Sequence, residues 1–333
     1  MSPTLELVCP AGSPAMLKAA IEAGADSVYC GFRDETNARN FPGLNFSPEE
    51  LRQAVDWAHE RGARVLLALN TFARADATDL WRASADAAAA TGVDAVIAAD
   101  LAVLAHMREA HPDTRLHLSV QAAAGTPEAI AFYAREYGVK RVVLPRVLSV
   151  EEIAALTPEI AVETEAFVYG GLCIMAEGRC ALSSYATGGS PNLSGVCSPP
   201  EAVSFEESGG ERVTRLSGFA IDRMPAGETG GYPTLCKGRF RAEGADQAAY
   251  LFEEPVSLNA MSLLAGLSRA GVTAVKVEGR QRGRAYVARV AAAFRAAIDA
   301  MARGESPAPY ESLLSDLAEG ARETTGAYRK RWR

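Results

Sequence analysis

The 333-residue sequence is poor in several features that often reveal function. It has four histidines and three tryptophans, and its 41 acidic residues outnumber its 34 basic residues, giving a formal net charge of −7. Scarce imidazoles limit histidine-based acid–base chemistry, and the acidic balance argues against a broad basic surface for binding a phosphate backbone. We therefore expect no nucleic-acid partner.

Targeting and membrane signals are also missing from the sequence. The first residues contain no basic stretch followed by an apolar one, and no apolar run of about 18 residues is free of charge. We expect a cytoplasmic protein with no membrane span. Because thiols stay reduced in that compartment, the six cysteines point to metal binding, catalysis or burial rather than disulfides.

Familiar catalytic motifs are absent as well. No Gly-x-Gly-x-x-Gly follows the first predicted strand, where a dinucleotide-binding sheet requires it. Neither Gly-x-Ser-x-Gly nor His-Glu-x-x-His occurs, so the usual serine-hydrolase and zinc-peptidase signatures are missing. His117 shares a predicted strand face with Ser119 and Gln121, but no nucleophile is evident beside it.

The sequence does contain a repeated alternation of strand and helix patterns. Seven short apolar runs are predicted as strands: Leu5–Cys9, Ser27–Gly31, Arg64–Leu69, Ala95–Ala99, Leu116–Val120, Arg141–Leu144 and Val162–Val168. Six amphipathic segments between them are predicted as helices: Pro14–Ala23, Pro48–Arg61, Thr78–Thr91, Leu101–Ala110, Pro127–Tyr137 and Val150–Leu156. Three of these helices begin with Ser or Thr followed by Pro, a pattern typical of helix starts.

A later unit completes the pattern, with helix Asn259–Arg269, strand Ala274–Glu278 and helix Arg284–Ala302. Eight parallel strands predict an α/β fold of the (β/α)₈, TIM-barrel type, with a doubly wound open sheet as the alternative. We predict barrel strands 1 to 7 in residues 1–170 and a cysteine-bearing insertion at 171–258 with a small hairpin, Val203–Glu207 and Val213–Ser217. Residues 259–303 then close the barrel with strand 8, and 304–333 form a C-terminal extension.

Four cysteines fall in the predicted insertion, which leaves the C-terminal end of strand seven. Cys173, Cys180, Cys197 and Cys236 have the spacing C-x₆-C-x₁₆-C-x₃₈-C. Structural zinc sites prefer pairs two to four residues apart, and bacterial ferredoxin spacing is absent too. Spacing alone leaves an iron–sulfur cluster, a zinc ion and unliganded thiols open. Cys9 and Cys30, at the ends of the first two strands, fit small buried side chains or a redox pair.

Polar residues at the predicted barrel mouth form a candidate substrate site. Asn70, Gln121 and Arg146 follow strands, and Glu165 lies within the seventh. Lys276 and Glu278 alternate on strand eight, so they share a face and could form a buried ion pair. Alternatively, Arg39, Arg146 and Lys276 supply positive charge for a small anionic substrate such as a dicarboxylate.

Several blocks of the sequence carry a family resemblance. They are ELVCPAG at 6–12, AGADSVYCG at 23–31, NARNF at 37–41, LNFS at 44–47, YGGLCIMAEGRC at 169–180 and VKVEGR at 275–280. With these blocks the chain resembles the collagenase-like peptidases of family 32 in the U class, over nearly its whole length. DETNAR at 34–39, GGYPTLCKGR at 230–239 and VEGRQR at 277–282 resemble the members of that family that serve ubiquinone biosynthesis.

This resemblance implies a specific function. It implies one [4Fe-4S] cluster held by Cys173, Cys180, Cys197 and Cys236, and a heterodimer with a UbiV-like partner. It also implies hydroxylation of a ubiquinone precursor without dioxygen, with prephenate as the hydroxyl donor. The chain would then be a hydroxylase subunit with no catalytic residue yet assigned, and Arg179, between two ligands, could tune the cluster. A peptidase, an RNA base hydroxylase and a non-catalytic scaffold stay open as alternatives.

Overall fold

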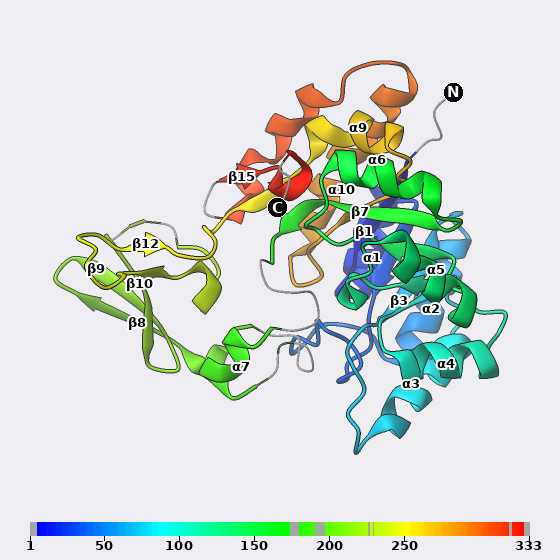
Figure 1. Cartoon of the computed structure of the whole chain (residues 1–333), viewed down its shortest axis with the longest axis horizontal. Coiled ribbons are helices and arrows are strands. Elements are labelled where there is room, and N and C mark those ends of the chain that lie inside the picture. Colours follow the sequence, from blue (N-terminus) through cyan, green and yellow to red (C-terminus); the bar gives the residue numbers. More distant parts are fainter. Residues whose placement is uncertain are drawn as a thin grey trace.

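The structure is a computed structural model that describes residues 5–173, 180–189, 191, 197–225, 227–228, 230–319 and 322–329. Its centre is a closed barrel of eight parallel strands, which confirms the predicted (β/α)₈ fold (Figure 1). The barrel strands are β1 (Glu6–Pro10), β2 (Ser27–Cys30), β3 (Arg64–Leu69), β4 (Ala95–Ala98), β5 (Leu116–Leu118), β6 (Arg141–Val143), β7 (Glu163–Gly171) and β14 (Ala274–Val277). Strand β14 closes the barrel because it pairs in parallel with both β1 and β7.

Helices surround the barrel. They are α1 (Pro14–Glu22), α2 (Pro48–His59), α3 (Thr78–Ala90), α4 (Leu101–Ala110), α5 (Pro127–Tyr137), α6 (Val150–Leu156), α9 (Leu264–Arg269) and α10 (Arg284–Ala302). The predicted caps are confirmed: Ser13, Ser47 and Thr126 each accept a hydrogen bond from a backbone N–H in the first turn. Such caps satisfy amide groups that a helix start leaves unpaired, and the proline that follows each fits the first turn.

Side chains on the barrel strands alternate between two environments. Leu7, Cys9, Val28 and Cys30 belong to the large core cluster that packs between strands and helices. Val8 and Tyr29, their sequence neighbours, belong to a separate small cluster of barrel strands. This period of two places the polar members of β1, β5, β6, β7 and β14 inside the barrel.

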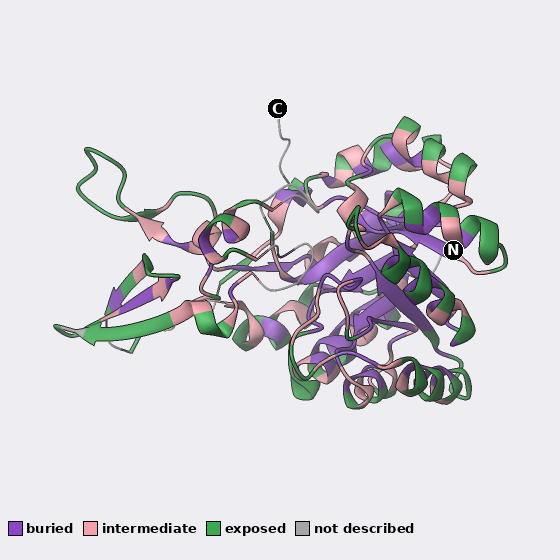
Figure 2. Cartoon of the chain, turned by 90° about the horizontal axis from the view of Figure 1, so that it is seen from below, coloured by how far each residue is buried: buried purple, intermediate pink, exposed green. Residues whose placement is uncertain are grey.

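A long segment joins β7 to the last part of the barrel. It contains α7 (Leu182–Thr187), β8 (Val203–Ser208), β9 (Glu211–Leu216), β10 (Phe219–Pro225), the two-stranded pair β11 (Arg239–Phe240) and β12 (Ala249–Tyr250), and 3₁₀ turns at Pro200–Ala202 and Leu235–Lys237. These elements lie to one side of the barrel as a lobe (Figure 1). The lobe has its own small core around Leu216 and Ile221 and a largely exposed surface (Figure 2).

The structure differs from the sequence-based expectation at three places in this segment. The expected hairpin has a third strand, β10, joined to β9 by the two-residue turn Ser217-Gly218. The expected helix Asn259–Arg269 begins at Leu264, because Ser257–Asn259 forms strand β13, antiparallel to the end of β7. Strand β7 itself extends to Gly171 for the same pairing. These pairings are tertiary contacts that a local apolar pattern does not encode.

The C-terminal segment packs back on the barrel through a 3₁₀ stretch (Ala308–Leu317), β15 (Glu323–Thr324) and a 3₁₀ turn (Gly326–Arg329). The Tyr169 hydroxyl donates to the Leu314 carbonyl, and the Tyr328 hydroxyl donates to the Phe167 carbonyl. Both carbonyls and hydroxyls are buried, so these bonds fix the segment beside β7. Among the described helices, none is both long and apolar enough to cross a membrane.

Candidate functional site

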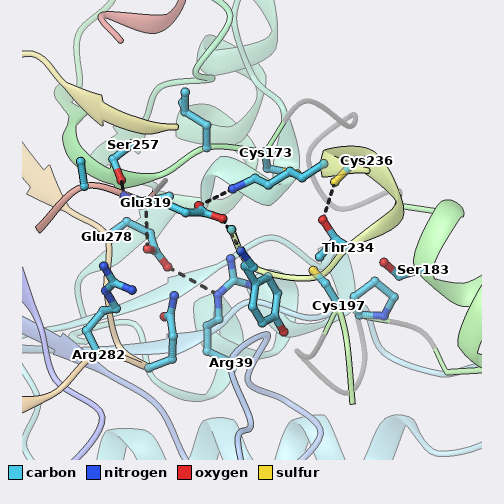
Figure 3. Close-up of a pocket in the computed structure, with 18 of the residues that line it drawn as sticks. Arg39, Cys173, Ser183, Cys197, Thr234, Cys236, Ser257, Glu278, Arg282 and Glu319 are labelled. Atoms are coloured by element: carbon cyan, nitrogen blue, oxygen red, sulfur yellow. Dashed lines mark hydrogen bonds and ion pairs between the residues drawn. The ribbon is translucent and has the colours of Figure 1, made fainter. Parts of the chain in front are cut away.

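A cavity of about 600 Å³ lies at the C-terminal mouth of the barrel. Three parts of the chain line it, as Figure 3 shows: the barrel mouth, the cysteine-bearing segment and the C-terminal segment. All four late cysteines are among the lining residues, together with Arg39, Gln121, Arg146 and Glu278 from the mouth and Glu319 from the C-terminal segment. Active sites of barrel enzymes form at this end of the strands.

The chain reaches the cavity through a sharp turn at the end of β7. Gly170 has φ +114°, and a Cβ there would lie 2.7 Å from the Glu278 carbonyl oxygen. Only glycine allows this approach of β7 to the residues that follow β14. The turn leads directly to Cys173 and brings the Gly171 N–H to 3.3 Å from Oε2 of Glu278.

The other three cysteines come from separate turns of the insertion. Cys180 precedes α7, Cys197 precedes the 3₁₀ turn that leads into β8, and Cys236 lies in the 3₁₀ turn Leu235–Lys237. The Thr234 hydroxyl lies 3.2 Å from the Cys236 sulfur. Burial raises the pKa of Cys197 to about 11, against the attraction of Arg39 and with a further contribution from the other three cysteines.

The positions of the four cysteine sulfurs can be compared with the ligand geometry of a metal site. A zinc ion with four thiolates at about 2.3 Å holds its sulfurs about 3.8 Å apart. In the described part of the chain, no three of these sulfurs lie within 4.8 Å of one another. Four thiols that line one cavity are a donor set that either a four-thiolate zinc site or an iron–sulfur cluster could use.

Arg39 lies between the cysteines and Glu278 on the loop after β2 (Figure 3). Its loop is fixed by amide side chains: the Asn37 carbonyl oxygen accepts from the Arg39 N–H, and Asn45 donates to the Arg39 carbonyl. Its Nε lies 3.7 Å from Oε1 of Glu278. Burial alone would lower the pKa of Arg39, but nearby groups raise it, the Glu278 carboxylate most of all, so the guanidinium stays charged.

A smaller cavity of about 50 Å³ continues from the mouth into the barrel. Lys276 and Arg280 lie over the ring of Tyr29, with 4.0 Å and 5.4 Å to the ring centroid. Burial lowers the pKa of Arg280 to about 10. Oε1 of Gln121 is buried here and has no hydrogen-bond partner within the described residues. The inner cavity thus combines positive charge with an unused acceptor.

Six of the seven predicted substrate residues line these cavities. Arg39, Gln121, Arg146 and Glu278 line both, and Asn70 and Lys276 line the inner one. Asn70 accepts a hydrogen bond from the Ala38 N–H, so it positions the Arg39 loop. Arg146 donates to the Gly171 carbonyl and lies over the Phe167 ring.

Glu165 is placed deeper than expected. It is fully buried, with Lys276 Nζ 2.6 Å and Arg141 Nη1 3.2 Å from its carboxylate oxygens. The expected Lys276–Glu278 pairing is wrong, because Lys276 reaches back to Glu165 on the neighbouring strand while Glu278 faces Arg39. Strands β14 and β7 pair directly, so cross-strand neighbours compete with same-strand ones.

Sequence reasoning missed several residues of the site. Arg280 follows Glu278 at the same spacing of two and could have been found by extending that alternation beyond the strand. Tyr29 lies between Val28 and Cys30 in a uniformly apolar strand. The sequence therefore does not indicate that its side chain points into the barrel. Glu319 and Lys237 carry no local signature, because they meet only through the tertiary fold.

The remaining predictions concern histidines and the two early cysteines. His117 is buried inside the barrel with Arg115 Nε 3.0 Å from its Nε2, and burial beside Arg141 and Arg115 holds its pKa well below the usual value. Cys9 and Cys30 are buried in the helix-facing core, and burial raises the pKa of each thiol. This favours the packing role over a redox pair at the mouth. Arg179 lies outside the described residues.

Comparison with known proteins gives a consistent family assignment. The sequence profile of peptidase family U32 matches residues 12–330. The chain is 28% identical over 302 residues to tRNA hydroxylation protein P1 of Bacillus subtilis, covering 89% of this chain and 63% of that protein. It is 29% identical over 332 residues to tRNA hydroxylation protein P of Escherichia coli, covering 95% and 72% respectively.

A third relative has a related name. The chain is 30% identical over 308 residues to the 23S rRNA 5-hydroxycytidine C2501 synthase of Escherichia coli, covering 89% of this chain and 40% of that protein. This chain therefore spans between 40% and 72% of the length of these three relatives. Hydroxylation is the activity that all three names share.

Proposed function

The chain belongs to peptidase family U32, and from this premise we propose that it is the cluster-bearing subunit of an oxygen-independent hydroxylase. We infer that it is UbiU-like, works with a UbiV-like partner and acts on the ring of a ubiquinone precursor. One observation carries the proposal: four cysteines and the cationic barrel mouth line a single cavity. A redox group and a binding site for a small anionic molecule would therefore be adjacent.

Cys173, Cys180, Cys197 and Cys236 would hold a [4Fe-4S] cluster. With four protein thiolates such a cluster supplies electron transfer. Replacing a ring C–H bond by C–OH with a hydroxyl group that is already fully reduced removes two electrons and releases protons. The cluster would pass these electrons one at a time to an external electron acceptor, such as a redox protein, so a hydroxylase of this kind needs an electron path. The placement of all four thiols around one cavity supports this choice of cofactor.

The mouth residues would bind the anionic partner of the reaction. Arg39 and Arg146 line both cavities, and the Arg39 charge is only partly compensated by Glu278 at 3.7 Å. Lys276 contributes less than expected, since Glu165 neutralises it at 2.6 Å. A dicarboxylate such as prephenate, as hydroxyl donor, would have its carboxylates beside Arg39 and Arg146. The Gln121 Oε1 atom would accept a hydrogen bond from a hydroxyl group of the same molecule.

A peptidase activity has less support. Proteolysis needs a nucleophile with an adjacent base or a metal-bound water. The described lining of the two cavities includes no histidine, and the buried His117 contacts Arg115 rather than a serine or cysteine. The cysteines are the only thiol nucleophiles among those lining residues, and each would lack an imidazole partner.

RNA base hydroxylation is the second candidate. The names of the three relatives favour it, since each refers to a hydroxylated RNA. A flipped base would enter a cavity at the barrel mouth in the same way as a free ring. The net charge of −7 opposes it, because RNA binding draws on a basic surface for phosphate contacts.

The cofactor is tested by anaerobic purification with iron and sulfide counting and optical spectra. We expect about four irons and four sulfides per chain, lost when any of the four cysteines becomes serine. Stoichiometric zinc without sulfide, or a protein without metal, would end the cluster proposal.

The substrate is tested in a strain that lacks the gene. Ubiquinone should fall in anaerobic culture and stay normal in aerobic culture, whereas loss of a hydroxylated nucleoside from tRNA or rRNA would favour the second candidate. Complementation with Arg39→Gln should fail although the purified variant keeps the cluster absorbance. Arg33→Gln, on the same loop but paired with Glu50 at the surface, is the matched control and should complement fully.

A further inference from the structure

A second group of ligand-type side chains lies on the helical layer outside the barrel. Within the described residues, Asp86, His106 and His111 are the one set of three histidine, cysteine or carboxylate residues whose ligand atoms all lie within 4.8 Å of one another. Nε2 of His106 lies 2.6 Å and Nε2 of His111 2.7 Å from the same oxygen, Oδ1 of Asp86. None of the three lines either cavity.

Two adjacent helices bring these side chains together. Asp86 lies on α3, His106 lies on α4, and His111 is the residue that ends α4. Helices α3 and α4 are neighbours on the outside of the barrel, away from the lobe (Figure 1). The imidazole rings are about one quarter exposed and the Asp86 side chain about one half, so the three ligand atoms converge on a point that solvent can reach.

The charge state of the group suits a cation. Asp86 supplies a carboxylate oxygen at the point where the two imidazole nitrogens meet, and this negative group attracts a cation. Two imidazole nitrogens and one carboxylate oxygen are ligands that zinc and its neighbours in the first transition series accept. Calcium and magnesium prefer all-oxygen sites and are poorly matched to two imidazoles.

The distances allow an ion to enter with small movements. Zinc lies about 2.0–2.2 Å from imidazole nitrogen and carboxylate oxygen, which puts neighbouring tetrahedral ligands roughly 3.4 Å apart. The present N–O distances of 2.6 and 2.7 Å must therefore open by less than about 1 Å. Partly exposed side chains can make this change by rotating about their χ angles, without moving either helix.

We propose that Asp86, His106 and His111 bind one divalent transition-metal ion of the zinc class, with the remaining coordination position open to water. The ion would replace the two N–H···O hydrogen bonds and join α3 to α4. This site is separate from the cysteines and does not depend on the function proposed for them. The competing explanation is a hydrogen-bonded triad that only joins the two helices.

Cobalt(II) titration of the full-length chain separates these explanations. Cobalt bound by thiolates gives intense charge-transfer bands, whereas cobalt bound by nitrogen and oxygen gives only weak visible bands, so binding at the cysteines is counted separately. The variants are His106→Gln, His111→Gln and Asp86→Asn. His59→Gln is the matched control, because His59 makes a single pair with Asp94 at 2.9 Å without a third ligand.

The wild-type chain and His59→Gln should bind one more equivalent of cobalt by nitrogen and oxygen than the three variants, or bind it at least 10-fold more tightly. Zinc should then raise the melting temperature of the wild-type chain more than that of His106→Gln, because binding at the cysteines is common to both proteins. The proposal is overturned if all five proteins bind the same number of equivalents with the same affinity, or if His59→Gln loses the equivalent that the other variants lose.

Discussion

The two ends of the barrel interior contain similar charged side chains, but those at one end are closely paired and those at the other end are less so. At the amino-terminal end, Arg141 donates to Glu6, Glu163 and Glu165, and Lys276 contacts Glu165 at 2.6 Å. At the carboxyl-terminal mouth, Arg39 lies 3.7 Å from Glu278 and the Gln121 oxygen has no partner among the described residues.

The difference between the two ends indicates which charges serve folding and which serve binding. A buried network in which each charge is paired stabilises one arrangement and leaves little for a ligand to contact. Polar groups held in place but incompletely paired are available to a ligand, and such groups concentrate at functional sites. The comparison predicts that substitutions at the amino-terminal end, called the closed end below, reduce stability. Substitutions at the mouth should instead affect cofactor retention and turnover.

The largest effect is expected for Glu165→Gln. This change leaves Lys276, 4% exposed, without its carboxylate, and breaking a buried ion pair costs about 3–5 kcal/mol. Chemical denaturation should show that loss in the free energy of unfolding. Glu136→Gln, which breaks an exposed pair with Arg135, is the control and should change it by no more than about 1 kcal/mol. Equal losses in the two variants would contradict the distinction between the ends.

The next effect concerns how the mouth is held together. Glu319 accepts from the Tyr232 N–H at 2.8 Å and pairs with Lys237, so it fixes the chain on both sides of the turn that contains Cys236. Glu319→Ala leaves a nearly buried Lys237 unpaired, which should cost about 1.5–3 kcal/mol locally. Hydrogen exchange should speed up in residues 230–240 and iron should be lost several-fold faster, while global unfolding changes less.

Glu311→Ala is the control for this experiment. Glu311 belongs to the same C-terminal segment but contacts Ser262, away from the cysteines. It should leave both exchange at 230–240 and iron retention unchanged. If Glu319→Ala also left them unchanged, the C-terminal segment would have no part in holding the cysteine site.

The sequence predicts the barrel well because barrel strands and helices are encoded locally. Helices Leu101–Ala110, Pro127–Tyr137 and Arg284–Ala302 and strand Arg64–Leu69 have the predicted bounds, since each has its own apolar period and end signals. The period of two also placed Lys276 and Glu278 inside the barrel. The period of two could not predict which residue pairs with Lys276, because its partner Glu165 lies on the adjacent strand and 111 positions away in sequence.

The mouth was predicted less completely, for a physical reason. Each of its residues is brought there by a turn or by a segment distant in sequence, such as Gly170 with its positive φ or Glu319 beyond the barrel. Strand β13 has three residues and pairs antiparallel in an otherwise parallel barrel, so no local pattern separates it from the start of a helix. The cysteines were found because their residue type alone indicates chemistry.

Lowering the pH should have a moderate effect on the free energy of unfolding, through a histidine at the closed end. The pKa of buried His117 lies well below its unfolded value of about 6.5, because of burial and of the charges of Arg141, Arg115 and Lys276, which outweigh Glu6. Below pH 6.5 the unfolded chain binds a proton there that the folded chain does not, so stability falls with falling pH. Between pH 7.5 and 5.5 this group should remove about 1.4 kcal/mol.

Unfolding measured across this range in His117→Gln should lack that part of the slope. Ser119, the buried residue after β5, accepts a hydrogen bond from the Gln121 N–H; Ser119→Ala removes that bond but no titrating group, so it should keep the wild-type slope. A slope in His117→Gln equal to that of the wild type would mean that His117 is protonated in the folded protein.

The smallest effect is expected in the lobe, which tests whether this part of the insertion is energetically separate from the mouth. Ser217 has φ +48° and Gly218 φ +84° in the two-residue turn between β9 and β10, the geometry of a type I′ turn. Serine is strained there and asparagine is tolerated, so Ser217→Asn should protect the β9–β10 amides from hydrogen exchange by about 0.5–1 kcal/mol. Because Ser217 and Gly218 form only the turn between β9 and β10 and neither lines the cavity, unfolding of the barrel and iron retention should stay as in the wild type. A change in iron retention would instead show that the lobe and the cysteine site open together, as one unit with the mouth.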